Sequence, residues 1–292
     1  MQAVTLDRTS SGWAAIRAPL AKLASSTGVA AVLAVTLRRA TQGPLGEVDA
    51  DTWMIFFTVV GVTYAVVVGF LVVELLSRHH RLSVAIHGEL NAIEDVRDYL
   101  LYVDDNVEAK ERIVSALRRY VECLIGPEWE RMSGTATEDG DELGSDTSSQ
   151  IYEVTRTVEE LRLHDASDEV ALTAIIQRLA DVTTHRTNRL ELAGSHLSPP
   201  LRTLVVFLSA VIVGGFVLMP VGSLVIHLYM VSATVLSIHL LYMVLDDLSR
   251  PFRGIWRISQ APFRRLASRL ADRRLLSRAG VVAPSGSWEV GG

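Results

Sequence analysis

The chain has 292 residues, of which 49% are hydrophobic and 21% are charged, and its formal net charge is −5. The hydrophobic residues are gathered in blocks, because residues 55–73, 204–219 and 223–245 contain no charged side chain. A soluble domain spreads its apolar residues at the helix or strand period, and a disordered chain has too few of them. This distribution excludes both classes and is typical of a helical membrane protein.

Three stretches are long enough to cross a membrane, which takes roughly 20 mainly apolar residues. They are residues 52–76, 201–219 and 223–245. Pro220-Val221-Gly222 forms a tight turn between the last two, so we expect them to make a helical hairpin.

A fourth stretch, residues 23–37, has only 15 uncharged residues, between Lys22 and the pair Arg38-Arg39. Basic side chains at both ends can reach the membrane surface from a short span. The alternatives are an interfacial helix and a cleaved signal peptide, although arginines stand where a signal peptide needs small residues. We expect a retained span, which makes the fold an all-α membrane protein with four transmembrane helices, the first of them weak.

Charge sets the expected orientation. Residues 77–200 hold 13 basic and 24 acidic residues, a net charge of −11, whereas residues 246–292 hold nine arginines and four acidic residues, a net charge of +5. A basic tail beside a span marks a cytoplasmic end. We therefore expect a multi-pass plasma-membrane protein with both termini in the cytoplasm.

The acidic region 77–200 would repel phosphate and disfavours nucleic-acid binding. The expected parts are a cytoplasmic segment 1–22, two spans in 23–76, a cytoplasmic helical region 77–200, a span hairpin 201–245 and a basic cytoplasmic tail 246–292.

The region between the second and third spans reads as a helical bundle. Apolar residues recur at helical spacing through residues 79–103, so the second span should continue as one helix of about 50 residues, roughly 75 Å long. A helix near 113–125 is expected to stop at Gly126-Pro127. Further helices are expected at 151–161 and 167–196, where apolar residues recur every three to four positions.

Residues 133–149 are acidic and nearly without apolar side chains, so they read as a mobile loop. The four helices have more apolar surface than they can bury on one another. Contacts with neighbouring subunits, in a homo-oligomer, would cover the remainder.

Four segments together resemble the bestrophin-like domain family of bacterial integral membrane proteins, and the resemblance spans about residues 25–258. The segments are residues 60–70, residues 120–132, Thr187 to Leu190 leading into Pro199-Pro200, and residues 247–254. The sequence departs from the family pattern in two places. Leu248-Ser249 interrupts the family's Asp-Arg-Pro-Phe pattern, and no Trp occurs near residues 75–77. The resemblance implies a distant kinship with bestrophins, which are oligomeric anion channels with four spans per subunit and a helical cytoplasmic part. It marks as structural motif positions Tyr120, Trp129, Pro200, Asp247, Pro251, Phe252 and Gly254.

Two rows of residues on the second span are candidates for a pore wall or a helix interface. Gly61, Ala65 and Gly69 recur at every fourth position, which allows a neighbouring helix to approach closely, either within the subunit or at an oligomer interface. Beside them runs an apolar row that could form a constriction that gates by dewetting, or could contact lipid or a neighbouring subunit. Its members are Phe57, Tyr64, Val68 and Leu71.

Two histidines, His227 and His239, lie inside the last span. Twelve residues separate them, which places them about 120° apart on a helix, so they cannot share one metal ion. We expect each to be neutral and bonded to a neighbouring helix, with a pore or proton-relay role as the alternative.

The segment after the last span is expected to redirect the chain along the membrane surface. Pro251 cannot continue a helix and Gly254 allows a turn. Asp247 is expected to pair with Arg250 or Arg253. Residues 256–265 then read as an amphipathic segment lying in the membrane interface.

No phosphate-binding glycine loop, nucleophile elbow or zinc-ligand pair occurs in the sequence. We therefore expect neither an enzyme nor a bound metal or cofactor. The leading hypothesis is an oligomeric channel or transport-type protein that conducts inorganic ions, most simply anions. The alternative is a membrane-anchored scaffold or sensor whose acidic cytoplasmic bundle recruits a partner. An acidic vestibule would repel anions, which counts against the first hypothesis.

Overall fold

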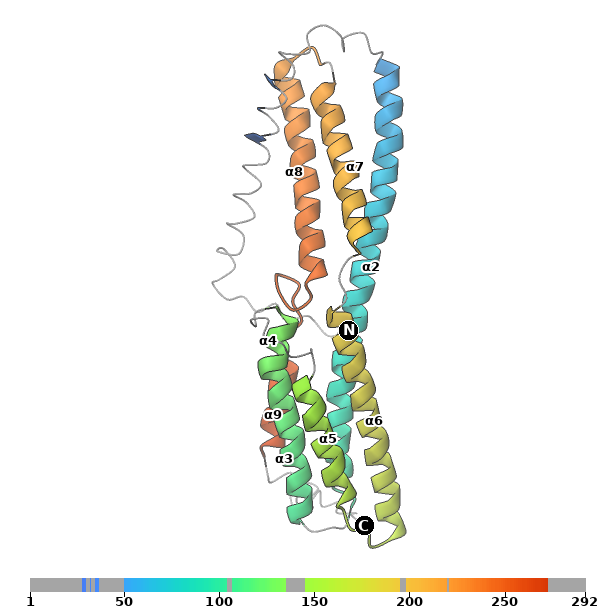
Figure 1. Ribbon diagram of the computed structural model, residues 1–292, viewed down its shortest axis with the longest axis vertical. Coiled ribbons are helices and arrows are strands. Elements are labelled where there is room, and N and C mark those ends of the chain that lie inside the picture. The colour runs from blue at the N-terminus through green and yellow to red at the C-terminus, as the bar shows by residue number, and fades with distance from the viewer. Residues whose placement is uncertain are drawn as a thin grey trace, which may run out of the picture. The chain divides into compact units, whose positions relative to one another are not determined.

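The computed structural model describes residues 28–29, 32, 35–36, 50–103, 107–134, 145–194, 198–219 and 221–272 (Figure 1). Within these ranges every regular element is a helix and none is a strand, as expected. Most of the weak first span, residues 23–37, lies outside the described residues. The helices are α2 (Ala50–Tyr99), α3 (Val107–Cys123), the π-helical turn η1 (Leu124–Glu128), α4 (Trp129–Met132), α5 (Ser145–Glu159), α6 (Ala166–Gly194), α7 (Pro199–Leu218), α8 (Leu224–Ser249) and α9 (Ala261–Leu270).

The chain divides into two compact units. The first, here called the span unit, contains the described residues up to Ser77, residues 198–250 and Gly254–Trp256. The second, here called the bundle unit, contains residues 78–194, Pro251–Arg253 and the chain from Arg257 onward. Helix α2 begins in the span unit and ends in the bundle unit, because no proline interrupts its 50 residues.

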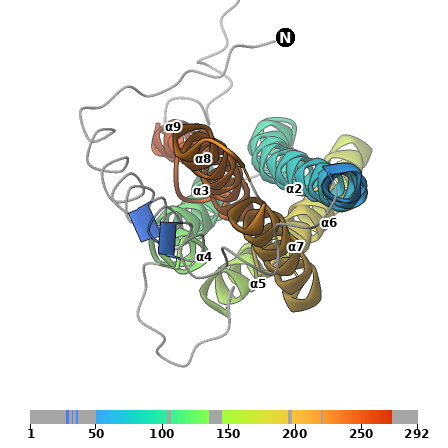
Figure 2. The same cartoon turned by 90° about the horizontal axis from the view of Figure 1, so that it is seen from above.

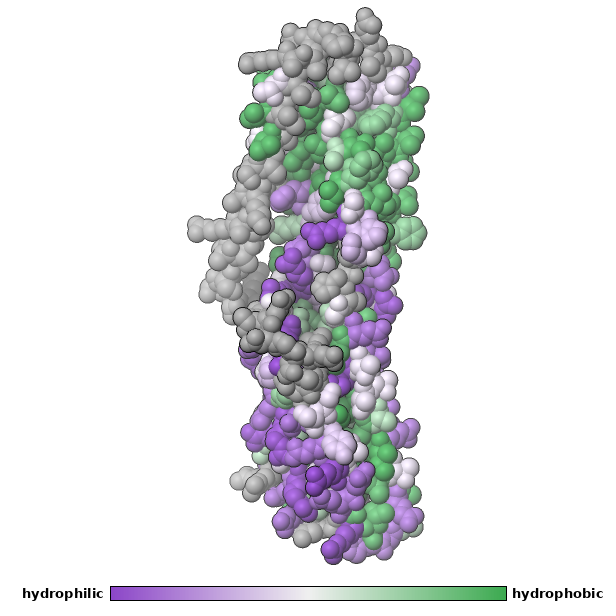
Figure 3. Space-filling model, in the orientation of Figure 1, coloured by the Kyte–Doolittle hydropathy of each residue, from purple (hydrophilic) through white to green (hydrophobic). Residues whose placement is uncertain are grey.

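The span unit is built from the first half of α2 together with α7 and α8. Among the described residues three helical stretches, within 51–99, 166–218 and 224–249, are long and apolar enough to cross a membrane, and they contain the three strong candidate spans. Helices α7 and α8 lie side by side (Figures 1 and 2). On the face that Figure 3 shows, the surface of these helices is mostly apolar, whereas that of the bundle unit is mostly hydrophilic.

The bundle unit has one apolar core to which α2, α3, α5, α6 and α9 all contribute. Helix α3 packs against both α5 and α9. From α9, Phe263 and Leu266 are buried almost completely. The prediction that residues 256–265 lie in the membrane interface is therefore wrong for the part from Ala261 onward, because the apolar face of α9 is covered by the protein itself.

Two predicted boundaries also need correction. The helix does not stop at Gly126-Pro127 but bends there through η1 and resumes as α4, ending at Met132. Gly126 takes φ −85° and ψ −105°, which is not helical and makes room for Pro127 inside the turn. The segment predicted as a loop, 133–149, is already helical from Ser145, where α5 begins. Its residues 135–144 lie outside the described residues.

Candidate functional site

The inner face of α2 in the span unit packs against the hairpin. Val68 and Leu71 are only 8% and 3% exposed, and they join a cluster with Val205 of α7 and Leu245 of α8. Phe57 stacks on Phe216 of α7, with ring centroids 4.3 Å apart. The row that was expected to face a pore, lipid or a neighbouring subunit therefore packs within the chain.

The opposite face of α2 presents a second apolar row. Val62, Val66 and Phe70 are 59%, 53% and 74% exposed. With Ile55 and Val73, which are also exposed, they are spaced by three, four or seven residues and so lie on one side of the helix. We call these five residues the outer stripe.

The small residues lie between these two faces. Gly61 is half-buried, and Ala65 and Gly69 are exposed. A Cβ atom added at either glycine would meet no atom within 4 Å in the described part of the chain. Close helix contact at this row is not provided by α7 or α8.

Three hydroxyl groups meet where the three helices of the span unit pack. The Ser209 hydroxyl of α7 donates to the Val205 carbonyl at 2.7 Å. Its oxygen lies 3.3 Å from the Tyr64 hydroxyl of α2 and 3.2 Å from the Tyr242 hydroxyl of α8. Ser209 can donate to the Tyr64 hydroxyl and can accept from the Tyr242 hydroxyl, so the cluster links the three helices.

His227 links the two helices of the hairpin. Its side chain is 2% exposed, and its Nε2 lies 2.9 Å from the Phe216 carbonyl of α7. That carbonyl would normally accept from the amide of residue 220, which is a proline and has no N–H. The His227 side chain satisfies it when Nε2 carries a proton, so this residue is bonded to the neighbouring helix α7. His239 is half-buried, and among the described residues it has no hydrogen-bonding partner.

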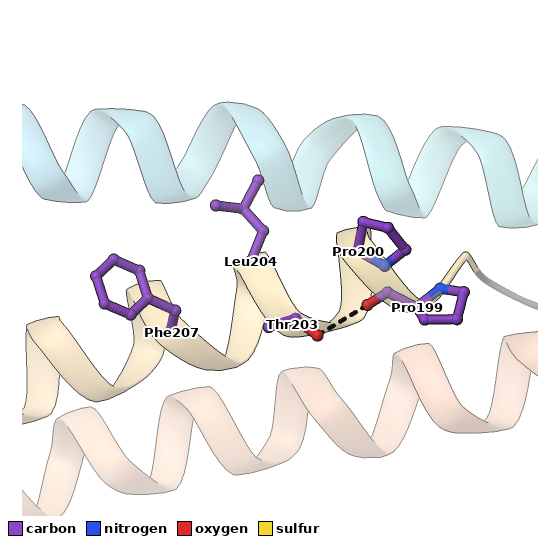
Figure 4. A pocket seen from close by; sticks show the side chains of 5 residues that line it. All are labelled: Pro199, Pro200, Thr203, Leu204 and Phe207. Carbon is purple, nitrogen blue, oxygen red and sulfur yellow. Dashed lines mark hydrogen bonds between the residues drawn. The ribbon is translucent and has the colours of Figure 1, made fainter.

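An open apolar hollow lies at the beginning of α7, and Figure 4 shows the side chains that line it. They are Pro199, Pro200, Thr203, Leu204 and Phe207. The Thr203 hydroxyl donates to the Pro199 carbonyl at 2.9 Å, so this lining offers no free donor to an ion.

Asp247, near the end of α8, holds the turn that follows. Its carboxylate accepts hydrogen bonds from the backbone amides of Ile255 and Trp256, at 3.0 and 3.2 Å. Gly254 has φ +81°, and a Cβ atom there would overlap the Asp247 carboxylate. Arg250 pairs with Asp246 instead, at 2.9 Å, so the expected pairing of Asp247 with Arg250 is wrong.

The bundle unit encloses a cluster of charged side chains. Arg189 of α6 donates from Nε to Glu89 of α2 at 2.7 Å, and its Nη2 lies 2.6 Å from Glu128 of η1. All three side chains have no exposed surface. The Tyr120 hydroxyl of α3 donates to Glu89. One arginine therefore joins α2, α6 and η1 in the interior.

The cluster extends to the beginning of α5. The buried Thr147 hydroxyl donates to Glu128, and Arg186 Nε donates to Thr147 at 2.8 Å. Arg186 also donates to the Ser148 hydroxyl at 2.7 Å. Arg189 contacts both carboxylates directly, and Arg186 is linked to Glu128 through Thr147, so two guanidinium groups accompany the two buried carboxylates. The name buried network is used below for this set of side chains: Glu89, Tyr120, Glu128, Thr147, Ser148, Arg186 and Arg189.

Ionisation in the buried network follows from burial and charge. Burial raises the pKa of Tyr120 well above its usual value, and the neighbouring Glu89 raises it further. Burial alone would lower the pKa of Arg189, but the Glu89 and Glu128 carboxylates outweigh it and raise that pKa. The arginine therefore stays charged and the tyrosine stays protonated.

Comparison with known proteins agrees with this architecture. The bestrophin-like domain matches residues 23–263. The chain belongs to the bestrophin-like family. Two crystal structures of a bacterial bestrophin homologue from Klebsiella pneumoniae, each with one substitution, are similar to it. One has 14% identity and a TM-score of 0.68, covering 87% of this chain and 99% of its own. The other has 13% identity and a TM-score of 0.69, covering 86% and 98%.

A third structure, of a protein described only as a membrane protein, has 14% identity and a TM-score of 0.68, covering 86% of this chain and 98% of its own. At these identities the likeness concerns the fold alone. No protein of curated function matches the chain.

Several motif residues of this bestrophin-like chain meet in the bundle unit. Trp129 packs edge-on against Phe252, with ring centroids 5.2 Å apart, and its ring lies 6.4 Å from that of Phe263. Tyr120 belongs to the buried network, and the Pro251 carbonyl accepts a hydrogen bond from the Ile258 amide at 2.8 Å. These motif residues therefore shape a core.

Sequence reasoning missed the buried network, although the pattern contains a signal for it. Glu89 occupies a core position among apolar residues spaced by three and four, between Ile86 and Ile93. Arg186 and Arg189 continue the row of Ile175, Leu179 and Val182 in the same way. A charged side chain in such a position has to find a buried partner of opposite charge.

The other titratable residues that the sequence draws attention to have separate contacts. His87 Nδ1 lies 2.7 Å from the Ser83 carbonyl of its own helix, and Asp181 pairs with Arg178 at 2.9 Å. The His185 ring lies where a side chain on Gly88 would be. Within the described ranges no three His, Cys, Asp or Glu side chains are grouped so as to hold a metal ion.

Proposed function

We propose that the protein is an oligomeric channel for inorganic anions in the plasma membrane and is not an enzyme. Each subunit would contribute four spans, with the bundle unit and both termini in the cytoplasm. Family membership supports this proposal, as does the likeness of the fold to bacterial bestrophin homologues. The charge asymmetry of the chain supports the orientation.

The outer stripe is the observation that carries the proposal. It is apolar, it faces away from α7 and α8, and no charged residue occurs on α2 between Ile55 and Val73. When several copies assemble around an axis, Val62, Val66 and Phe70 would line a narrow passage. A constriction of this chemistry conducts when it is wet and closes when it dries. It would also let an ion pass without binding it tightly.

Assembly from several copies is required, because the described spans of one chain cannot surround a passage. The bundle unit exposes large apolar side chains that a neighbouring copy would cover. Val84 of α2 and Ile176 of α6 are 52% and 55% exposed, and Val170 of α6 is 71% exposed. Isolated exposed apolar residues are ordinary, but several on neighbouring helices indicate an interaction surface.

The decisive experiment is reconstitution of the purified chain in planar bilayers under a chloride gradient. The proposal predicts single-channel currents whose reversal potential follows the chloride gradient. Currents whose reversal potential follows the cation gradient would support a channel but reject its selectivity for anions. This result is expected if the acidic charge of the bundle unit determines which ions pass.

Absence of conductance in several salts would reject the channel. A chain that is also monomeric in detergent would then favour the membrane-anchored scaffold, for which the net charge of −11 in residues 77–200 would supply the recruiting surface.

A further inference from the structure

The turn after α8 leaves two large apolar side chains in the open. Ile255 is 58% exposed and Trp256 is 54% exposed. Both backbone amides are bound by the Asp247 carboxylate. The turn is therefore fixed while its side chains project outward, which distinguishes it from α9, whose apolar side chains are buried.

The hydrogen bonds of Asp247 also fix the depth of these side chains. The uncharged part of α8 ends at Leu245, two residues before Asp247, and two residues of a helix rise only about 3 Å. Because the Ile255 and Trp256 amides lie at hydrogen-bond distance from Asp247, their side chains begin within a few ångströms of the edge of the apolar span. Tryptophan is enriched at this level of a membrane, because its ring is apolar and its N–H is polar.

We propose that Ile255 and Trp256 form a membrane anchor that inserts into the boundary between lipid headgroups and acyl chains. The occupant of this surface is the bilayer itself. Three features select it: the position at the end of a span, the rigid turn, and the absence of acidic residues from the sequence 250–257, which contains three arginines. A basic segment is attracted to anionic headgroups. The anchor does not depend on ion conduction.

The geometry also explains why the turn needs Gly254. Only glycine accepts φ +81° there and leaves room for the Asp247 carboxylate. With any other residue Asp247 could not hold both amides, and the two apolar side chains would lose their fixed depth.

Fluorescence quenching by brominated lipids tests the anchor in the full-length protein. The wild type and W256F are reconstituted in vesicles of phosphatidylcholine and phosphatidylglycerol, with bromine either near the headgroup or near the chain end. Subtracting the W256F spectrum from the wild-type spectrum isolates the emission of Trp256. This difference should be quenched most strongly by bromine near the headgroup. W129F is the matched control, because Trp129 is buried in the bundle unit and its difference spectrum should not be quenched.

Each other result overturns the anchor. A Trp256 emission that is red-shifted and unquenched would place the indole in water. A blue-shifted emission that no brominated lipid quenches would place it under protein, for example a second copy of the chain. Quenching that is strongest with bromine near the chain end would place it in the membrane interior. A D247N variant extends the test, because weaker hydrogen bonds to both amides should spread the quenching over depth.

Discussion

Arg189 and Glu89 lie one hundred residues apart in the sequence, yet they are joined by two hydrogen bonds of 2.7 and 3.2 Å in the interior of the bundle unit. Neither side chain is exposed. The pair connects α6 with α2, and the Glu128 carboxylate also contacts the Arg189 guanidinium group.

Replacing Arg189 with methionine should strongly destabilise the protein. The variant keeps most of the volume but removes the guanidinium group that contacts both Glu89 and Glu128, which costs about 3–5 kcal/mol. R178M is the matched control, because the ion pairs of Arg178 with Asp95 and Asp181 are exposed and worth about 1 kcal/mol or less. Denaturant titration in detergent, followed by circular dichroism, measures both. Equal losses for the two variants would contradict the stabilising role of the buried pair.

Tyr120 should make the protein sensitive to alkaline pH. Its pKa is raised in the folded state, so above about pH 10 the unfolded chain loses this proton while the folded chain keeps it. The free energy of unfolding should then fall by up to about 1.4 kcal/mol per pH unit. Y120F lacks this contribution, so its stability should fall less between about pH 9 and about pH 11. Y152F, changed at an exposed tyrosine, should follow the wild type. Parallel curves for Y120F and wild type would refute the assignment.

Two neighbouring glycines of α7 should respond differently to alanine. A Cβ atom on Gly215 would lie 2.8 Å from Phe56 and 3.1 Å from Phe57, whereas one on Gly214 meets no described atom within 4 Å. G215A should therefore cost about 1–3 kcal/mol through overpacking. G214A should be neutral or stabilise by up to about 1 kcal/mol, because alanine favours a helix. The thermal unfolding midpoint in detergent distinguishes the variants. An unchanged midpoint for G215A would show that the Phe56 and Phe57 rings can move aside at little cost.

Wetting of the outer stripe should control conductance if the stripe lines the passage. V66T keeps the shape of the side chain but replaces a methyl group with a hydroxyl group, so the constriction should dry less readily and conductance should rise severalfold. V225T makes the same change at an exposed position of α8 and should leave conductance unchanged. Single-channel recordings compare the two, and a V66T channel identical to wild type would remove Val66 from the pore wall.

His227 should contribute more to stability than His239, although both lie in α8. H227L leaves the Phe216 carbonyl without a donor inside an apolar layer, which should cost about 1–3 kcal/mol. H239L removes a histidine that has no hydrogen-bonding partner among the described residues, so it should be neutral or stabilising. Denaturation in the same detergent provides the comparison. A larger loss for H239L would indicate that His239 has a partner in the assembled oligomer.

The sequence predicted the elements that charge or its absence defines. The three spans follow from long uncharged stretches, and the continuation of the second span to residue 99 follows from uninterrupted helical spacing. The faces of α2 could not be predicted in the same way. Its span half is apolar all round, so the sequence does not distinguish the row that packs on α7 and α8 from the row that remains open.

The errors have related physical causes. An amphipathic helix such as α9 can cover its apolar face with lipid or with protein, and the sequence does not specify which. Gly126-Pro127 reads as a stop because proline lacks an N–H, yet a π-helical turn absorbs the bend and the helix resumes. The buried network could in principle have been predicted, since Glu89 and Arg189 interrupt rows of apolar residues. Which charged residues pair with each other, however, depends on which helices are neighbours.

The π-helical turn has a consequence for comparing relatives. A π-helical turn holds one more residue than the α-helical turn it replaces. Removing one residue from Leu124–Glu128 would let an ordinary α-helical turn form there, so the residues after it would stay on nearly the same face of the helix. The bend at Gly126 would disappear, whereas Glu128 would still face Arg189. Homologues that are one residue shorter here should therefore have a straight helix and keep their equivalents of Glu128 and Arg189.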